Sequence, residues 1–253
     1  MKLATWNVNS LKVRLEQVLD WLIQHQPDVL CLQETKLIDE NFPHQEIVAA
    51  GYHATFLGQK TYNGVALISK RPTQDVVTAI PGFSDEQKRV LAATIDDVRI
   101  VCVYIPNGQS LESDKYQYKL KWLAALHAWV KDELARHPKL ALLGDYNIAP
   151  DERDVYDPVA WADQVLFSPP ERAAFADLVN LGLEDSFRLF DQPEKSYTWW
   201  DYRMAAFRRN MGLRIDHILL SDALAKTCTS CVIDTQMRKL ECPSDPAPVM
   251  VVV

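Results

Sequence analysis

Residues 140–147, LALLGDYN, place polar side chains directly after an apolar run. Four apolar residues in a row are typical of a strand buried inside a sheet, and Gly144 ends this run. Asp145 and Asn147 then follow the buried strand, where a carboxylate seldom lies without a partner or a metal ion. We therefore predict a strand over 140–143 whose end carries polar groups with a chemical task.

Other predicted apolar strands carry polar residues in similar places, namely Asn7, Glu34, Asp216 and Asp245. Gathered at one sheet edge, such side chains would form an oxygen-rich pocket that suits Mg²⁺ or Mn²⁺ better than zinc. Taken singly, each acid has a plainer interpretation, because Asp145 after a glycine fits a turn or a helix cap. Composition and spacing alone therefore indicate a candidate metal site and no more.

Strands and helices are mixed along the whole chain. Strands are predicted over residues 2–6, 28–32, 65–69, 98–104, 140–143, 214–220, 231–234 and 248–253, and helices over 11–22, over 116–134 and after Pro170. Several connections between strands are too short to hold a helix, so part of the sheet is expected to be antiparallel. We predict an α/β protein with two packed sheets and helices outside, in one domain over residues 1–253, because no linker or boundary is visible.

The composition excludes several classes of protein. The chain has 253 residues, of which 48% are hydrophobic, so it is neither disordered nor short of a core. No apolar run is long enough for a membrane helix. The net charge of −7 argues against a protein that coats duplex DNA, although one local basic face stays compatible with it. An odd number of cysteines, five, spread along the chain fits reduced thiols, and a cytoplasmic location is expected.

A set of short motifs carries a resemblance to a known family. The motifs are TWNVN (5–9), LQETK (32–36), YNGVA (62–66), GDYNIAP (144–150), TWWDYR (198–203), GLRID (212–216) and PSD (243–245). In this order they resemble the exonuclease III family of DNA-repair nucleases over nearly the whole chain. Some motifs are shared with DNase I-like and with sphingomyelinase- or inositol-phosphatase-like phosphodiesterases, so a lipid or inositol-phosphate substrate is the distant alternative. The TWWDYR and GLRID stretches favour DNA.

The resemblance implies a four-layer α/β sandwich with its active site at one end of two packed mixed sheets. It implies hydrolysis of phosphodiesters in duplex DNA, as a 3′ to 5′ exonuclease, an abasic-site endonuclease and an enzyme that cleans blocked 3′ ends. The expected cofactor is Mg²⁺ or Mn²⁺, and the expected partner is duplex DNA with an abasic site or a 3′ end. No membrane partner is expected, and the chain is expected to be a monomer.

The matching motif positions also imply roles for individual residues. Glu34 would be the main metal ligand, with Asn7 and Asp245 nearby. Asp145 would position or deprotonate the attacking water, or protonate the leaving oxygen. One carboxylate that stays off the metal can handle a proton in this way.

Neutral donors and aromatic rings complete the implied site. Asn147 would bind the scissile phosphate, and Tyr104 and Asn107 would contact that phosphate or the leaving group. Trp199 and Trp200 would line the pocket for a base-free sugar, with core packing as the alternative for each ring. Basic residues that could hold the flanking phosphates, or else lie on a solvated face, are Arg203, Arg208, Arg209 and Arg214.

The chain departs from the family pattern at one position. The family continues Ser-Asp with a histidine that contacts the scissile phosphate and is held by the acid matching Asp216, whereas this chain has Pro246. Proline carries no proton acceptor and no backbone N–H. His217 is a poor substitute, because neighbouring side chains of a strand point to opposite faces. Two functions stay open: an attenuated metal nuclease, and an inactive binder of abasic sites or 3′ ends.

Overall fold

The computed structural model describes residues 1–253, which form two six-stranded sheets and one two-stranded ribbon. The first sheet has the order β13 (Ser230–Ile233), β14 (Val249–Val252), β1 (Lys2–Asn7), β2 (Val29–Gln33), β4 (Val65–Ser69), β3 (His53–Leu57). The second has the order β5 (Gln74–Val77), β6 (Val90–Ile95), β7 (Val98–Tyr104), β8 (Leu140–Asp145), β12 (Asp216–Ser221), β9 (Leu183–Asp185). The ribbon pairs β10 (Trp199–Trp200) with β11 (Gly212–Leu213).

Both large sheets are mixed. The pairs β1–β2 and β7–β8 are parallel, and every other neighbouring pair is antiparallel. Short connections such as the one between β6 and β7 leave room only for antiparallel pairing, as the sequence indicated.

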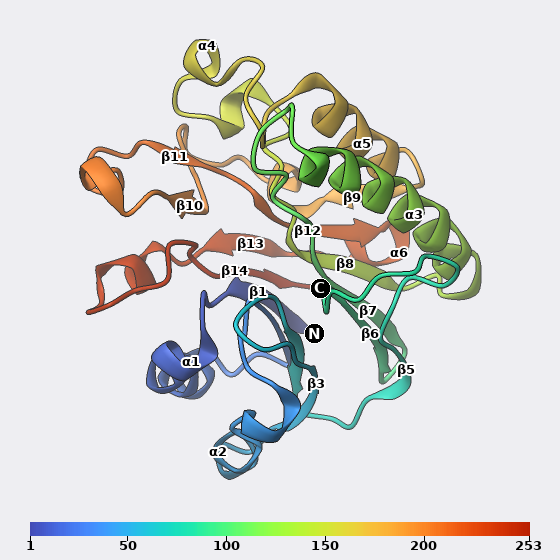
Figure 1. Cartoon of the computed structure of the whole chain (residues 1–253). Helices are drawn as coiled ribbons and strands as arrows, with labels where there is room; N and C mark the ends of the chain where they lie inside the picture. Colours follow the sequence, from blue (N-terminus) through green and yellow to red (C-terminus); the bar gives the residue numbers. More distant parts are fainter.

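Helices cover the outer faces of the two sheets (Figure 1). Helices α1 (Leu11–His25) and α2 (His44–Ala49) cover the first sheet, and α3 (Asp114–Arg136) and α5 (Pro169–Val179) cover the second. Two short helices, α4 (Pro158–Trp161) and α6 (Asp222–Ala225), complete the set. The predicted four-layer α/β sandwich is confirmed. No helix combines the length and the apolar character that crossing a membrane requires.

The alternation of side chains along each strand builds the layers. In β1, Leu3 points into the core between the sheets, whereas Ala4 and Trp6 point outward under α1. In β8, Leu143 points into the same central core and Leu142 points outward under α3. Because the period of a strand is two, Asn7 and Asp145 continue the inward-facing rows of these strands.

The predicted strands all exist. Those over 65–69 and 98–104 have the predicted bounds, and the ends of the others are shifted by one or two residues, as in β8, which runs on through Asp145. One shift has a physical cause: the strand predicted over 214–220 begins at Asp216, because the Arg214 amide donates to the Asp154 carbonyl outside the sheet, at 2.9 Å. Strands β3, β5, β6, β9, β10 and β11 were not predicted. Strand β5 is mostly exposed, and β9, β10 and β11 have two or three residues each, too few for a periodic pattern.

We predict that the chain unfolds in one cooperative transition, as a single domain over residues 1–253 should. The central core draws on both sheets, so neither sheet can keep it after the other has melted. Near-ultraviolet and far-ultraviolet circular dichroism in urea should therefore give coincident curves. Two separated transitions would contradict the single-domain interpretation.

Candidate active site

Polar side chains replace the apolar ones where the inward-facing rows reach one end of the two sheets. Tyr104 is the last residue of β7 and pairs with Asp145, the last residue of β8. Asp145 in turn pairs with Asp216, the first residue of the antiparallel strand β12. Asn7 ends β1 in the facing sheet. The register of the second sheet therefore places Tyr104, Asp145 and Asp216 side by side, and a hydrogen bond to Asp145 brings Asn7 to them from the facing sheet.

Asp145 is the centre of this edge. Its Oδ2 accepts a hydrogen bond from Asn7 Nδ2 at 2.8 Å, and its Oδ1 accepts one from the Asn147 backbone amide at 2.9 Å. Burial raises the pKa of Asp145 to about 7; the two hydrogen bonds lower it, and the charges of Glu34 and Asp245 raise it. A carboxyl group with this pKa can give or take a proton near neutral pH.

Two asparagines lie beyond Asp145. Asn147 adopts a left-handed backbone conformation with φ of 50°, which asparagine tolerates better than most residues. Its side chain accepts a hydrogen bond from Asn107 Nδ2 at 3.1 Å and donates one to the Ile105 carbonyl at 3.0 Å. Asn7, Asp145, Asn147 and Asn107 thus form one hydrogen-bonded line across the end of both sheets.

Glu34 follows β2 in a left-handed conformation with φ of 53°. Its carboxylate accepts a hydrogen bond from the Tyr104 hydroxyl and lies 3.1 Å from the ammonium group of Lys36. Burial, followed by the charges of Glu34 and Asp145, raises the pKa of Tyr104 well above its usual value, so the phenol stays a neutral donor.

Asn9 links the three residues expected to hold a metal ion, and sequence reasoning gave it no role. Its backbone amide donates to Asn7 Oδ1 at 2.9 Å, and its side-chain Nδ2 donates to Asp245 Oδ1 at 3.0 Å. Its Oδ1 accepts from the Lys36 ammonium, the partner of Glu34, at 2.5 Å. Asn9 and Lys36 belong to the TWNVN and LQETK motifs, so the signal was present, but only the fold shows that they meet.

The oxygen donors at this edge fit a hard divalent cation. No three His, Cys, Asp or Glu side chains form a closed metal cluster in the chain. Mg²⁺ is commonly held by only one or two carboxylates and keeps several waters, so Glu34, Asp245 and the amide oxygen of Asn7 are a sufficient set. Burial is the main reason that the pKa of Asp145 is raised, and the charges of Glu34 and Asp245 add to it. A divalent ion would offset the repulsion among these three carboxylates.

Only one of the two tryptophans lies at this edge. Trp199 is partly buried, and its Nε1 donates to Asp245 Oδ2 at 2.8 Å. Trp200 is buried, donates to Asn210 and packs edge-on against Phe207. The expectation that Trp200 lines a substrate pocket is therefore wrong. Adjacent residues of a strand point to opposite faces, so the two rings could not share one pocket.

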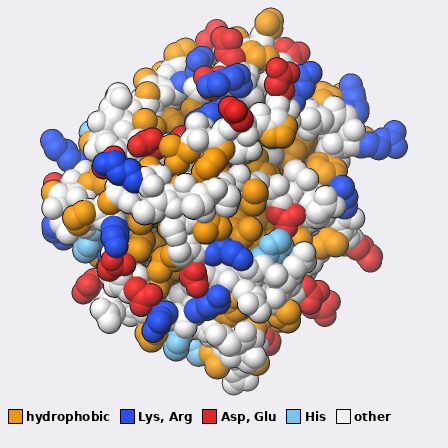
Figure 2. Space-filling view, turned by 180° about the vertical axis from the view of Figure 1, so that it is seen from behind, with side chains coloured by type: hydrophobic (Ala, Val, Ile, Leu, Met, Phe, Trp, Pro, Cys, Tyr) orange, Lys and Arg blue, Asp and Glu red, His pale blue; other side chains and the backbone are white.

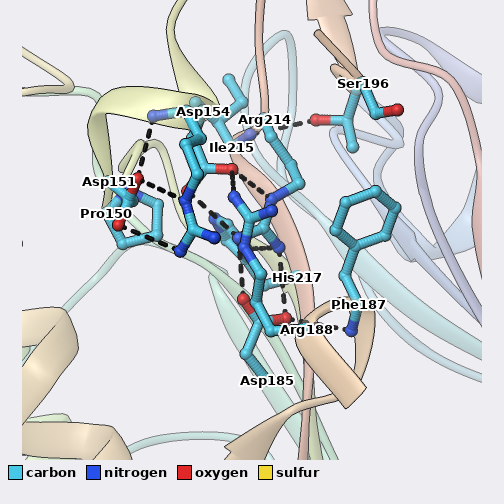
Figure 3. Close-up of polar contacts among 12 residues, drawn as sticks. Pro150, Asp151, Asp154, Asp185, Phe187, Arg188, Ser196, Arg214, Ile215 and His217 are labelled. Carbon is cyan, nitrogen blue, oxygen red and sulfur yellow. Dashed lines mark hydrogen bonds and ion pairs between the residues drawn. The ribbon is translucent and has the colours of Figure 1, made fainter. Parts of the chain in front are cut away.

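The arginines also separate. Arg203 is exposed in the loop between β10 and β11, as are Arg208 and Arg209. Arg214 is 1% exposed, so the expectation that it contacts DNA phosphates is wrong. Its guanidinium group pairs with Asp154 at 2.6 Å and with Asp185 at 2.7 Å, in the network of Figure 3. Burial lowers the pKa of Arg214, but the two carboxylates outweigh burial, and the net shift is upward.

Asp216 lies in the core without a partner. Neither carboxylate oxygen has a hydrogen bond of normal geometry. Burial, followed by the charge of Asp145, raises its pKa well above the usual value and so favours the protonated carboxyl group. His217 points to the opposite face, as expected: its Nδ1 accepts a hydrogen bond from the Arg214 guanidinium group at 3.0 Å, and its Nε2 donates one to the Ile148 carbonyl at 2.8 Å. Burial, followed by the charge of Arg214, lowers its pKa to about 3.

Pro246 is buried beside these groups. Its backbone forms an isolated antiparallel β-bridge with Trp199, and its carbonyl accepts a hydrogen bond from Trp6 Nε1 at 3.3 Å. The next residue, Ala247, donates to the Thr198 carbonyl at 2.7 Å. The backbone at Pro246 is thus tied to both sides of the site, although the side chain offers no polar atom.

We predict that Arg214→Met lowers the free energy of unfolding by about 3–5 kcal/mol, because it leaves the partly buried Asp185 carboxylate without its cation and the buried Asp154 carboxylate with Arg188 alone. The matched control is Arg153→Met, which removes an exposed pair with Asp151 and should cost less than about 1 kcal/mol. Urea unfolding measures both variants. Equal midpoints would show that the Arg214 network contributes no more than a surface pair.

Comparison with known proteins agrees with this site. Residues 4–245 match the model of the Endonuclease/Exonuclease/phosphatase family. Exodeoxyribonuclease III of Haemophilus influenzae is 36% identical, with 98% of each chain covered. A structure of the 3′ phosphatase NExo from Neisseria bound to a product DNA hairpin is 49% identical, with a TM-score of 0.98 over 100% of this chain and 98% of the other. An AP endonuclease from Archaeoglobus fulgidus is 37% identical, with a TM-score of 0.96 over 100% and 98%.

The fold, the site and these similarities agree: the chain belongs to the Endonuclease/Exonuclease/phosphatase family. The resemblance seen in the motifs is thereby confirmed. Members of the exonuclease III and AP endonuclease type generally depend on a divalent metal ion.

Proposed function

We propose that the protein is a divalent-metal-dependent phosphodiesterase of DNA repair, of the exodeoxyribonuclease III type. The observation that carries the proposal is the hydrogen-bonded line from Asn7 through Asp145 and Asn147 to Asn107, next to the carboxylates of Glu34 and Asp245. The relatives support DNA as the substrate, because their names cover an exodeoxyribonuclease, a 3′ phosphatase bound to DNA and an AP endonuclease. The proposed activities are 3′ to 5′ exonuclease, abasic-site cleavage and removal of blocked 3′ ends.

Glu34, Asn7 and Asp245 would hold Mg²⁺ or Mn²⁺. When bound, such an ion offsets the charge of the phosphodiester and polarises a phosphoryl oxygen. Tyr104 keeps the Glu34 carboxylate oriented through its hydrogen bond. Asn9 and Lys36 would hold the three ligands in register through the contacts described above.

Asp145 would move the proton. A pKa of about 7 lets its carboxyl group either take a proton from the attacking water or give one to the leaving oxygen. Asn147 and Asn107 each use one amide hydrogen within the site, and each keeps a second one for a phosphate oxygen. Neutral donors suit this task because they stabilise negative charge without repelling the metal ion.

The surface gives DNA a local basic contact within an acidic chain. Figure 2 shows acidic and basic side chains interspersed over one face, without one large block of a single sign. Arg203, Arg208 and Arg209 are exposed in one loop between β10 and β11, beside the ribbon that carries Trp199. These arginines would hold phosphates next to the lesion, and the Trp199 ring would face a base-free sugar.

The alternative is an inactive binder of abasic sites or 3′ ends. It is favoured by Pro246, which stands where the resemblance leads us to expect a histidine, and by the unpaired Asp216 carboxyl. The retained Glu34, Asp145 and Asn147 favour an enzyme of reduced rate. A monomer in the cytoplasm is the proposed form, and the five free cysteines agree with a reducing compartment.

We predict that Glu34→Ala slows cleavage of abasic duplex in Mg²⁺ by more than about 100-fold, because the main carboxylate for the ion is lost. EDTA should reduce the parent protein to the same level. The control is Glu16→Ala, which removes an exposed carboxylate on α1 and should keep the parent rate. If Glu34→Ala retains Mg²⁺-dependent cleavage, Glu34 does not belong to the metal site.

We predict that Pro246→His raises the single-turnover rate on abasic duplex by about 10²–10⁴-fold, the usual contribution of a positioned proton-transferring side chain. Its effect on DNA affinity should be much smaller. Asp216→Asn should then matter strongly in the Pro246→His background and little in the parent chain, because an acid that orients an imidazole has no such task without one.

The four combinations at one Mg²⁺ concentration form a double-mutant cycle. If Pro246→His gives no gain, the attenuated-nuclease interpretation fails. A parent chain that binds abasic duplex but does not cut it under any divalent ion would establish the binder instead.

A further inference from the structure

A fully buried cation lies directly behind the site. Lys119 is on α3 and has no exposed surface. Its ammonium group donates to the backbone carbonyls of Asn107, at 3.1 Å, and of Asn147, at 2.7 Å, and it also pairs with the Glu171 carboxylate. An ammonium group has three hydrogens, so these three acceptors use all of them.

The two carbonyls belong to the two asparagines at the end of the hydrogen-bonded line. The loop after β7 and the loop after β8 therefore meet at a single atom, Lys119 Nζ. The same loops are also joined in front, by Asn107 Nδ2 to Asn147 Oδ1 and by Asn147 Nδ2 to the Ile105 carbonyl. Gly108 brings its backbone close to the lysine stem, because an added Cβ there would lie 3.3 Å from Lys119 Cδ.

The ammonium group is itself held in place from the far side. Glu171 is buried and also accepts hydrogen bonds from the backbone amides of Leu166, at 3.1 Å, and Ser168, at 3.0 Å. These amides lie at or just before the start of α5, so Glu171 cannot turn away without breaking them. Lys119 is thus a fixed point between the start of α5 and the two asparagine loops.

Stability alone does not account for this arrangement. Burying an ammonium and a carboxylate costs several kcal/mol per ion, and well-packed neutral residues often replace such pairs at no loss. Burial lowers the pKa of Lys119, and Glu171 opposes that shift. What an apolar side chain could not supply is a donor group that bonds two loop carbonyls at once.

We propose that Lys119 is a positioning residue, which sets the backbones of Asn107 and Asn147 so that their amide groups meet the scissile phosphate. The inference rests on the phosphodiester-cleaving function proposed above. A displacement of about 1 Å at a reacting group can cost about 100-fold in rate. The lysine therefore acts through the asparagines and touches no substrate.

The experiment compares two buried ion pairs, each of which has one member on α3. Lys119→Met with Glu171→Gln removes the pair behind the site, with both single variants as references. The matched control is Arg99→Met with Glu133→Gln. This pair is also buried, with Arg99 Nε 2.5 Å from Glu133 Oε2. It lies far from the site, because Arg99 is near the start of β7 and Tyr104 is at its end. Each protein is assayed for single-turnover cleavage of abasic duplex, for DNA affinity and for urea unfolding.

The Lys119→Met, Glu171→Gln protein should be folded at the assay temperature and cleave about 10–100-fold more slowly than the parent, with DNA affinity changed only a few-fold. The control pair should keep the parent rate whatever its stability. Lys119→Arg is the second variant, because its planar guanidinium keeps the charge toward Glu171 but cannot reproduce the three-way geometry. It should lose rate as well, and a parent-like rate in either Lys119 variant would overturn the proposal.

A readout independent of activity separates this inference from the proposed function. The side-chain amide signals of Asn107 and Asn147 in ¹⁵N-labelled protein should shift in the Lys119 variants and stay in place in the Arg99 control. Unchanged signals would overturn the positioning role. A parent protein that cleaves no DNA would overturn the proposed function, whereas the amide signals would still test what Lys119 holds.

Discussion

The face-to-face packing of two six-stranded sheets is the constraint on which the rest of the structure depends. Every strand residue that points into the space between the sheets must be apolar or must find a partner, because water is excluded there. Along β8 this row runs from Ala141 and Leu143 to Asp145, and along β12 it runs from Leu220 and Ile218 to Asp216. The site is therefore the place where the central core stops being apolar.

The electrostatics of that edge follow from the same packing. Asp145 and Asp216 are adjacent across two strands and buried, and burial is the main reason that both pKa values are raised. Glu34 and Asp245 add to the upward shift of Asp145, and Asp145 adds to that of Asp216. Two lysines lie near these carboxylates. Lys36 pairs with Glu34, and Lys119 bonds the backbone of the asparagine loops. Arg214 neutralises a different pair of acids, deeper in the fold (Figure 3). The ion pairs of Arg214 are thus separate from the carboxylates that are expected to meet a metal ion.

Much of the fold and of the site follows from residue patterns, and the failures have identifiable causes. The apolar runs gave the buried strands, because a strand buried on both faces needs no alternation to be recognised. Exposed β5 and the two-residue strands β10 and β11 were missed because their pairing, not their composition, makes them strands. Arg214 and Trp200 were misassigned because a basic or aromatic residue near a motif reads the same whether it is exposed or buried.

The sequence by itself determined the four-layer fold and the residue types of the site, since periodicity and short motifs are local properties of the chain. It also determined that His217 could not replace a side chain on the face of Asp216, since neighbours on a strand point apart. Only the tertiary structure decided which polar groups meet. Asn9 joins Asn7, Asp245 and Lys36, and Lys119 reaches Asn107 and Asn147, through contacts between distant segments. Such contacts depend on sheet register and helix placement, which no local pattern encodes.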